Sequence, residues 1–197
     1  MFSFLSCLDL YADPISRQET FASFEKTVQM DDSTADFIIR CKTREFKVHK
    51  EILCAKSPVL RASILSDIME ANNGEIYVEE IDEKTLGSTI NFIYRGELDL
   101  GEDPDVRLFA WAGDKYLLPG FMKLLGFKMR QEKPTGELMA HLLMSADLHD
   151  AEDLRDVAVE KIKANRGLLK EEGFERVMKE KDPSVGLNIM LDLVKDL

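Results

Sequence analysis

Cysteine is scarce in this chain, because its 197 residues contain only Cys7, Cys41 and Cys54, with no CxxC pair. An odd number at these spacings does not make a disulfide framework, so we expect reduced thiols in a nuclear or cytoplasmic protein. The opening "MFSFLSCLDLYADP" has no basic residue before its apolar run and differs from a secretory signal peptide. No apolar run approaches the roughly 18 residues that a membrane helix needs, so we expect no membrane partner.

Basic residues are also fewer than acidic ones. The chain has 26 Lys and Arg against 37 Asp and Glu, a formal net charge of −11. A phosphate backbone would be repelled by this balance, which excludes nucleic acid as the expected partner. The composition is 45% hydrophobic and 32% charged, enough apolar residues for a core and against disorder.

The sequence lacks the motifs of the common catalytic sites: GxSxG, HExxH, the P-loop, GxGxxG and the EF-hand pattern are all absent. Three histidines, at 49, 141 and 149, do not stand at metal-ligand spacing. Cys54 near Lys56 is better explained as a small apolar residue on a core-facing turn than as an activated thiol. We therefore expect no catalytic residues, no cofactor and no metal, although an enzyme without these motifs stays an alternative.

Hydrophobic periodicity predicts mixed structure in the first two thirds of the chain. Segment 18–29 is predicted to be a helix, and segments 36–41 and 44–50 the two strands of a hairpin, the first more deeply covered and the second alternating between a buried and an exposed face. A third strand is predicted at 75–81, and a helix at 83–94.

Capping residues mark the predicted helix ends. Ser57-Pro58 begins one helix, since serine caps free amides and proline suits the first helical position. Gly96 is placed to end the helix at 83–94. Asp103-Pro104 opens a further helix, and the next one follows Pro119. Beyond the linker "QEKPTG" at 131–136 the pattern is helical throughout, with a turn at 149–150.

Several short motifs occur in order along the chain: Asp36 at the first strand, F-x-V-H-K at 46–50, Ser57-Pro58, F-I-Y-x-G at 92–96 and A-x-D-K-Y at 112–116. Together, at these compatible spacings, they resemble a BTB/POZ domain and in particular the speckle-type POZ protein group. "SADLHDAEDLRDVAVEKI" at 145–162 is similar to the start of the helical extension that follows BTB in that group. The resemblance covers roughly residues 20–197.

The resemblance implies an α+β fold, a small sheet flanked by helical hairpins, followed by an all-helical C-terminal extension. It divides the chain into an irregular tail at 1–17, the BTB/POZ domain at 18–131 and a 3-box/BACK-like extension at 135–197. Asp36, His49, Ser57, Pro58, Tyr94 and Gly96 are assigned structural roles. We predict that His49 is a hydrogen-bonding residue and not a base, with Asp36 as its candidate partner.

The resemblance also implies a homodimer built on the N-terminal helix. On periodicity alone, the apolar stripe of that helix could equally pack on its own domain. The resemblance favours the dimer. The stripe consists of Phe21, Phe24 and Val28.

A second implied partner is a cullin three ubiquitin-ligase scaffold. The family docks it through an apolar residue, any residue and a glutamate after the helix that follows Ser-Pro, and the match is Ile68, Met69, Glu70. By pattern alone, Ile68 and Met69 would more often complete the core face of a helix. Most of Leu142, Leu143 and Met144 in the extension is expected to lie in the core.

The chain departs from the family in one respect, because only a short tail precedes its BTB motifs, where the speckle-type group carries a substrate-binding (MATH) domain. We expect a non-catalytic, homodimeric adaptor that docks cullin three and helps recruit protein substrates, as yet unidentified, for ubiquitination in the nucleus or cytoplasm. The alternative is a BTB assembly module, a dimeriser or transcription cofactor, with no ligase role.

Overall fold

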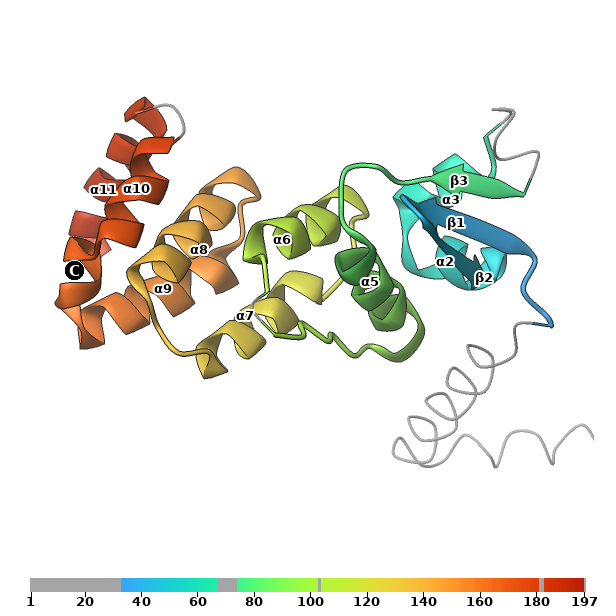
Figure 1. The fold of residues 1–197 in the computed structure, drawn as a ribbon, viewed down its shortest axis with the longest axis horizontal. Helices are drawn as coiled ribbons and strands as arrows, with labels where there is room; N and C mark the ends of the chain where they lie inside the picture. The colour runs from blue at the N-terminus through green and yellow to red at the C-terminus, as the bar shows by residue number, and fades with distance from the viewer. Residues whose placement is uncertain (1–32, 67–73, 103, 181–182, 197) are drawn as a thin grey trace, which may run out of the picture.

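A computed structural model describes residues 33–66, 74–102, 104–180 and 183–196. A small sheet with two short helices occupies one end of an elongated molecule, three helices follow in the middle, and the last helices form the other end (Figure 1). The predicted α+β class with a helical extension is confirmed. The helix predicted at 18–29 lies outside the described residues.

The sheet has three strands in the order β2-β1-β3. The central β1 pairs antiparallel with β2 and parallel with β3, and a turn with Lys42 at φ 51° closes the hairpin. β3 is shorter than the predicted 75–81, because Tyr77 already pairs with Arg40 and β1 ends one residue later. The strands are β1 (Phe37–Cys41), β2 (Arg44–Val48) and β3 (Glu75–Tyr77).

Two short helices follow the hairpin. The first, α2 (Lys50–Lys56), was not predicted and was read as a turn; two helical turns are too short to show a period, and Leu53 is its one fully buried residue. The second, α3 (Pro58–Ile64), begins where Ser57-Pro58 predicts. Cys54 is half-buried on α2 and packs against the core.

Three helices form the middle of the molecule: α5 (Glu83–Arg95), α6 (Val106–Lys115) and α7 (Phe121–Gln131). Gly96 ends α5 in the left-handed conformation, with φ 69°. The predicted start of α6 at Asp103-Pro104 is wrong by two residues, because the Asp105 carboxylate accepts the Arg107 backbone N–H at 3.0 Å and so caps the helix itself.

The helical extension consists of two helix pairs and a short 3-10 helix. The first pair turns at Asp150, φ 49°, as the sequence predicts, whereas the 3-10 helix was not predicted. Within the described ranges, none of the helices combines the length and apolar character that crossing a membrane requires. The elements are α8 (Gly136–Leu148), α9 (Glu152–Ala164), η2 (Arg166–Lys170), α10 (Glu172–Glu180) and α11 (Pro183–Asp196).

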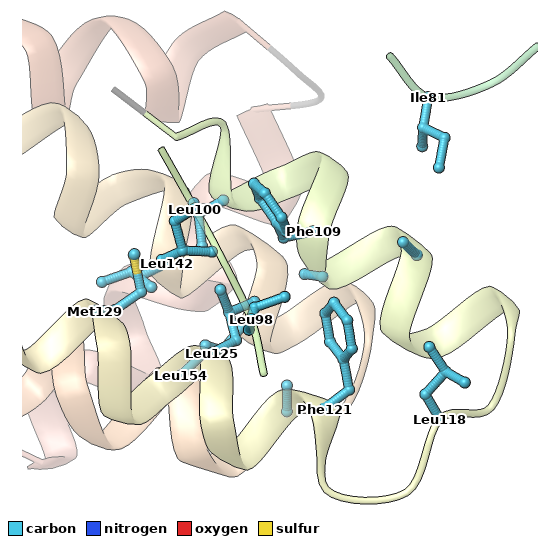
Figure 2. Close-up of a cluster of buried hydrophobic side chains, with 14 of the residues drawn as sticks. Ile81, Leu98, Leu100, Phe109, Leu118, Phe121, Leu125, Met129, Leu142 and Leu154 are labelled. Atoms are coloured by element: carbon cyan, nitrogen blue, oxygen red, sulfur yellow. The ribbon is translucent and has the colours of Figure 1, made fainter. Parts of the chain in front are cut away.

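One hydrophobic core runs from the middle helices into the extension. Leu125 and Met129 of α7 are fully buried beside Leu142 of α8 and Leu154 of α9 (Figure 2). Leu142 and Leu143 are fully buried and Met144 is half-buried, which confirms that this stretch belongs mostly to the core. The segment 132–135 therefore joins two helical parts that share buried side chains, and the predicted domain boundary there stays a prediction.

Candidate protein-docking surface

The buried hydroxyl of Ser57 ties α3 to the far end of α6. Its Oγ accepts the Leu60 N–H at 3.1 Å and donates to the Tyr116 carbonyl at 2.6 Å, and the residue has no exposed surface. Pro58 occupies the first turn, where its missing backbone N–H costs no helical hydrogen bond. One side chain thus caps a helix and fixes that helix against α6, which gives the corner between the sheet and the middle helices a defined position.

His49 lies in a hydrogen-bonded chain with Tyr94 on α5. The Tyr94 hydroxyl accepts the His49 backbone N–H at 2.7 Å and contacts the ring Nδ1 at 2.9 Å. The ring Nε2 lies 2.9 Å from the Thr34 hydroxyl, so both ring nitrogens of His49 have a hydrogen-bond partner. Burial raises the pKa of Tyr94, an effect that the nearby Asp36 charge reinforces.

The candidate partnership between His49 and Asp36 is wrong. The Asp36 carboxylate accepts the Lys50 backbone N–H at 2.9 Å, and so it satisfies a free amide in the first turn of α2. His49 is committed to Tyr94 and Thr34 instead. Both side chains still have structural, hydrogen-bonding positions, but each holds a different part of the β2–α2 corner.

An open groove of about 390 Å³ lies between α3, β3 and the end of α6. Val59 and Ser63 of α3, Tyr77 of β3 and Tyr116 form parts of its wall. Tyr77 is 54% exposed, and Leu65, just after α3, is 66% exposed. In the sequence, Leu65 precedes and β3 follows the segment with the predicted docking motif, and that segment lies outside the described residues.

Of the polar groups at this groove, the Lys115 ammonium has a hydrogen-bond partner and the Tyr116 hydroxyl has none among the described residues. Lys115 Nζ donates to Glu80 at 2.5 Å and lies 4.4 Å from the centre of the Trp111 ring. The hydrogen bond from Lys115 lowers the pKa of Glu80. The Tyr116 hydroxyl, on a residue only 4% exposed, has no hydrogen-bond partner among the described residues, and burial raises its pKa.

The extension is held to α6 and α7 by polar contacts as well as by the shared core. His149 Nδ1 lies 2.9 Å from the Asp114 carboxylate of α6. Lys161 Nζ donates to the carbonyls of Arg130 and Glu132 at 2.9 and 2.8 Å, at the end of α7. These contacts fix the first helix pair of the extension on the middle helices, so that the two parts can present one continuous surface.

The predicted dimer stripe and docking motif lie outside the described residues and stay predictions; they are Phe21, Phe24 and Val28, and Ile68, Met69 and Glu70. The groove between α3, β3 and the end of α6 was not predicted from the sequence. The only signal for it was the A-x-D-K-Y motif, which contains Lys115 and Tyr116. In the described part of the chain, no three His, Cys, Asp or Glu side chains gather as a metal site would require.

Comparisons with known proteins identify the domain. Residues 26–133 match the model of the BTB/POZ domain. The chain is 29% identical over 97 residues to Kelch-like protein 40a of Danio rerio, covering 49% of this chain and 16% of that protein. It is 30% identical over 140 residues to TD and POZ domain-containing protein 5 of Mus musculus, covering 71% and 41%.

Among solved structures, the BTB domain of human gigaxonin is similar at 22% identity and a TM-score of 0.48, covering 58% of this chain and 91% of that chain. This chain spans less than half the length of either curated relative. Because the family model covers more than half of the chain, this protein belongs to the BTB/POZ domain family, whose domains are protein-interaction modules.

Proposed function

We propose that this protein is a homodimeric, non-catalytic BTB adaptor that docks a cullin three ubiquitin-ligase scaffold and helps recruit substrate proteins for ubiquitination, in the nucleus or the cytoplasm. The observation that carries the proposal is the family match over residues 26–133. The mechanism is positional: a dimer holds two scaffolds and two substrates together, and linked sites can raise avidity by about 10² to 10⁴-fold.

The geometry around α3 supports the docking part of the proposal. The buried Ser57 cap fixes where α3 starts, and the helix ends at Ile64, four residues before the Ile68-Met69-Glu70 motif. The motif therefore follows the helix after Ser-Pro in the sequence, as the family's docking signature requires. An apolar anchor such as Ile68 typically contributes about 2 kcal/mol or more at an interface, roughly thirtyfold in affinity.

The experiment is a mass measurement by light scattering on the full chain, alone and with the purified amino-terminal domain of cullin three. We expect twice the 22.4 kDa of one chain for the protein alone, and one cullin fragment per chain when it is added. Phe24→Asp should halve the first mass, because it places a charge in the apolar dimer stripe.

Ile68→Asp and Glu70→Lys should each abolish or strongly weaken cullin binding without changing the mass of the protein alone. A matched control is Leu187→Asp, which makes the same kind of change at an exposed leucine on α11, remote from the groove. A dimer that ignores the cullin fragment would favour the assembly module with no ligase role. A monomer that also ignores it would refute the proposal.

A further inference from the structure

A second, larger groove lies at the opposite edge of the sheet, between β2, α5 and the segment 97–101. Its volume is about 910 Å³, near the upper end of the range of ligand sites. β2 forms one wall, and in the part of the chain that the structure describes this strand pairs only with β1. An edge strand offers unpaired backbone N–H and C=O groups to any extended chain that lies beside it.

The groove has an apolar floor with a cation above it. Phe46 of β2 is half-buried and faces Gly87 of α5, where an added Cβ would lie 3.2 Å from the ring. The small residue lets helix and strand approach closely at this point. The Arg44 guanidinium stands 4.6 Å from the centre of the Phe46 ring, so a positive charge covers one face of the aromatic side chain.

Arg95, at the end of α5, is the feature that points to a ligand. The residue lines the groove, its Nε is buried, and this Nε has no hydrogen-bond partner among the described residues. A buried donor left without a partner costs about 1–3 kcal/mol, more when it is charged. A carboxylate is the group that satisfies a guanidinium best, since two parallel N–H···O bonds match its geometry.

Acidic residues of the groove do not fill this role. Glu45 pairs with Arg40, and Glu83 accepts the backbone N–H and hydroxyl of Thr43 at 3.0 and 2.8 Å. Glu97 and Asp99 also line the groove, so an acidic ligand gains affinity only where its carboxylate reaches Arg95. Because Glu97 and Asp99 repel other carboxylates in the groove, a peptide with separated carboxylates should bind better than a ligand with adjacent negative charges.

We propose that the groove between β2 and α5 binds an extended acidic peptide segment of a partner protein. The segment would add as a strand beside β2, place an apolar side chain near Phe46 and give a carboxylate to Arg95, combining strand addition with arginine recognition of an acid. Only the biological role of this groove rests on the proposed function, in which the bound segment belongs to a substrate held by the adaptor. Peptide binding itself needs no cullin.

The test is fluorescence anisotropy with a short labelled peptide of alternating valine and glutamate, added to the full-length protein without cullin. We expect saturable binding that weakens as salt is raised. A valine–lysine peptide and a valine–glutamate peptide methylated on alternate backbone nitrogens should each bind about tenfold or more weakly, since one loses the charge match and the other the strand hydrogen bonds.

On the protein side, Arg95→Gln should weaken binding about tenfold, and Arg95→Lys should weaken it less, because lysine keeps the charge and loses the fork. Arg61→Gln, at an exposed arginine of α3, is the matched control and should leave affinity unchanged. If Arg95→Gln does not fold, judged by its circular dichroism, Arg95→Lys and the two altered peptides decide.

The proposal is overturned if the valine–glutamate peptide shows no saturable binding or if Arg95→Gln binds as well as the original protein. It is also overturned if the peptide lowers the mass of the protein in solution, because the groove then belongs to an interface between two copies. Loss of cullin binding with intact peptide binding would refute the adaptor function alone, so the two failures can be told apart.

Discussion

Replacing Ser57 by alanine tests whether one buried hydroxyl joins α3 to α6. The change removes the cap on the Leu60 N–H, which typically costs about 1 kcal/mol, within a range of roughly 0.5–2. It also leaves the Tyr116 carbonyl without the hydroxyl donor at 2.6 Å, for a further cost of about 1–3 kcal/mol at a fully buried site. We therefore expect a total loss of about 2–4 kcal/mol, a large part of the stability of an ordinary domain.

The assay is urea unfolding followed by circular dichroism, comparing midpoints at unchanged slope. Thr135→Ala is the matched control, because Thr135 also caps a helix, accepting the Leu138 N–H at 3.2 Å, but is exposed and holds no second element. The control should lose only about 1 kcal/mol. Equal losses for the two variants, within about 0.5 kcal/mol, would refute the idea that Ser57 links two elements.

Three further predictions concern single contacts. The hydrogen bond from the Arg107 side chain lowers the pKa of Asp105 in the folded protein. The ionised carboxylate therefore contributes its full stability above the pKa of an unfolded aspartate, near pH 4, and this contribution is lost as pH falls through the lower pKa of the folded state. Asp105→Asn should flatten the acid side of a curve of unfolding free energy against pH, and an unchanged curve would contradict this. Gly136→Ala should lower the free energy of unfolding by about 1–3 kcal/mol, since its Cβ would lie 2.6 Å from the Leu168 carbonyl, and an unchanged urea midpoint would refute that clash. His49→Gln should leave dimer mass and cullin binding nearly intact if the fold survives, whereas loss of cullin binding by a folded dimer would show that His49 acts at the interface.

The sequence predicted best where the signal was local. Ser57-Pro58 marked a helix start and Gly96 a helix end because capping chemistry depends on a few neighbouring residues. Helix α2 was missed because seven residues hold too few buried positions to show a period. The α6 start was placed on the wrong aspartate, since two acidic residues flank Pro104 and the sequence offers no way to choose between them.

The partner of His49 and the two grooves needed distances between residues remote in the sequence. His49 and Tyr94 are 45 positions apart, and the sequence named Asp36 as the candidate partner of His49, whereas the path of α2 places the Lys50 N–H beside the Asp36 carboxylate. Arg95 looked like an ordinary residue in the last turn of a helix. The tertiary structure alone shows that its Nε is buried and that Arg95 lines one groove with β2 and the segment 97–101.

By itself, the amino-acid order determined the α+β class, the helix start at Ser57-Pro58, the helix end at Gly96 and the BTB/POZ motifs, because each depends on side-chain type at short spacing. The tertiary structure decided which polar groups find partners, where grooves open and how one core joins the middle helices to the extension. These properties arise when segments far apart in the chain come into contact, and short-range spacing carries no information about such distances.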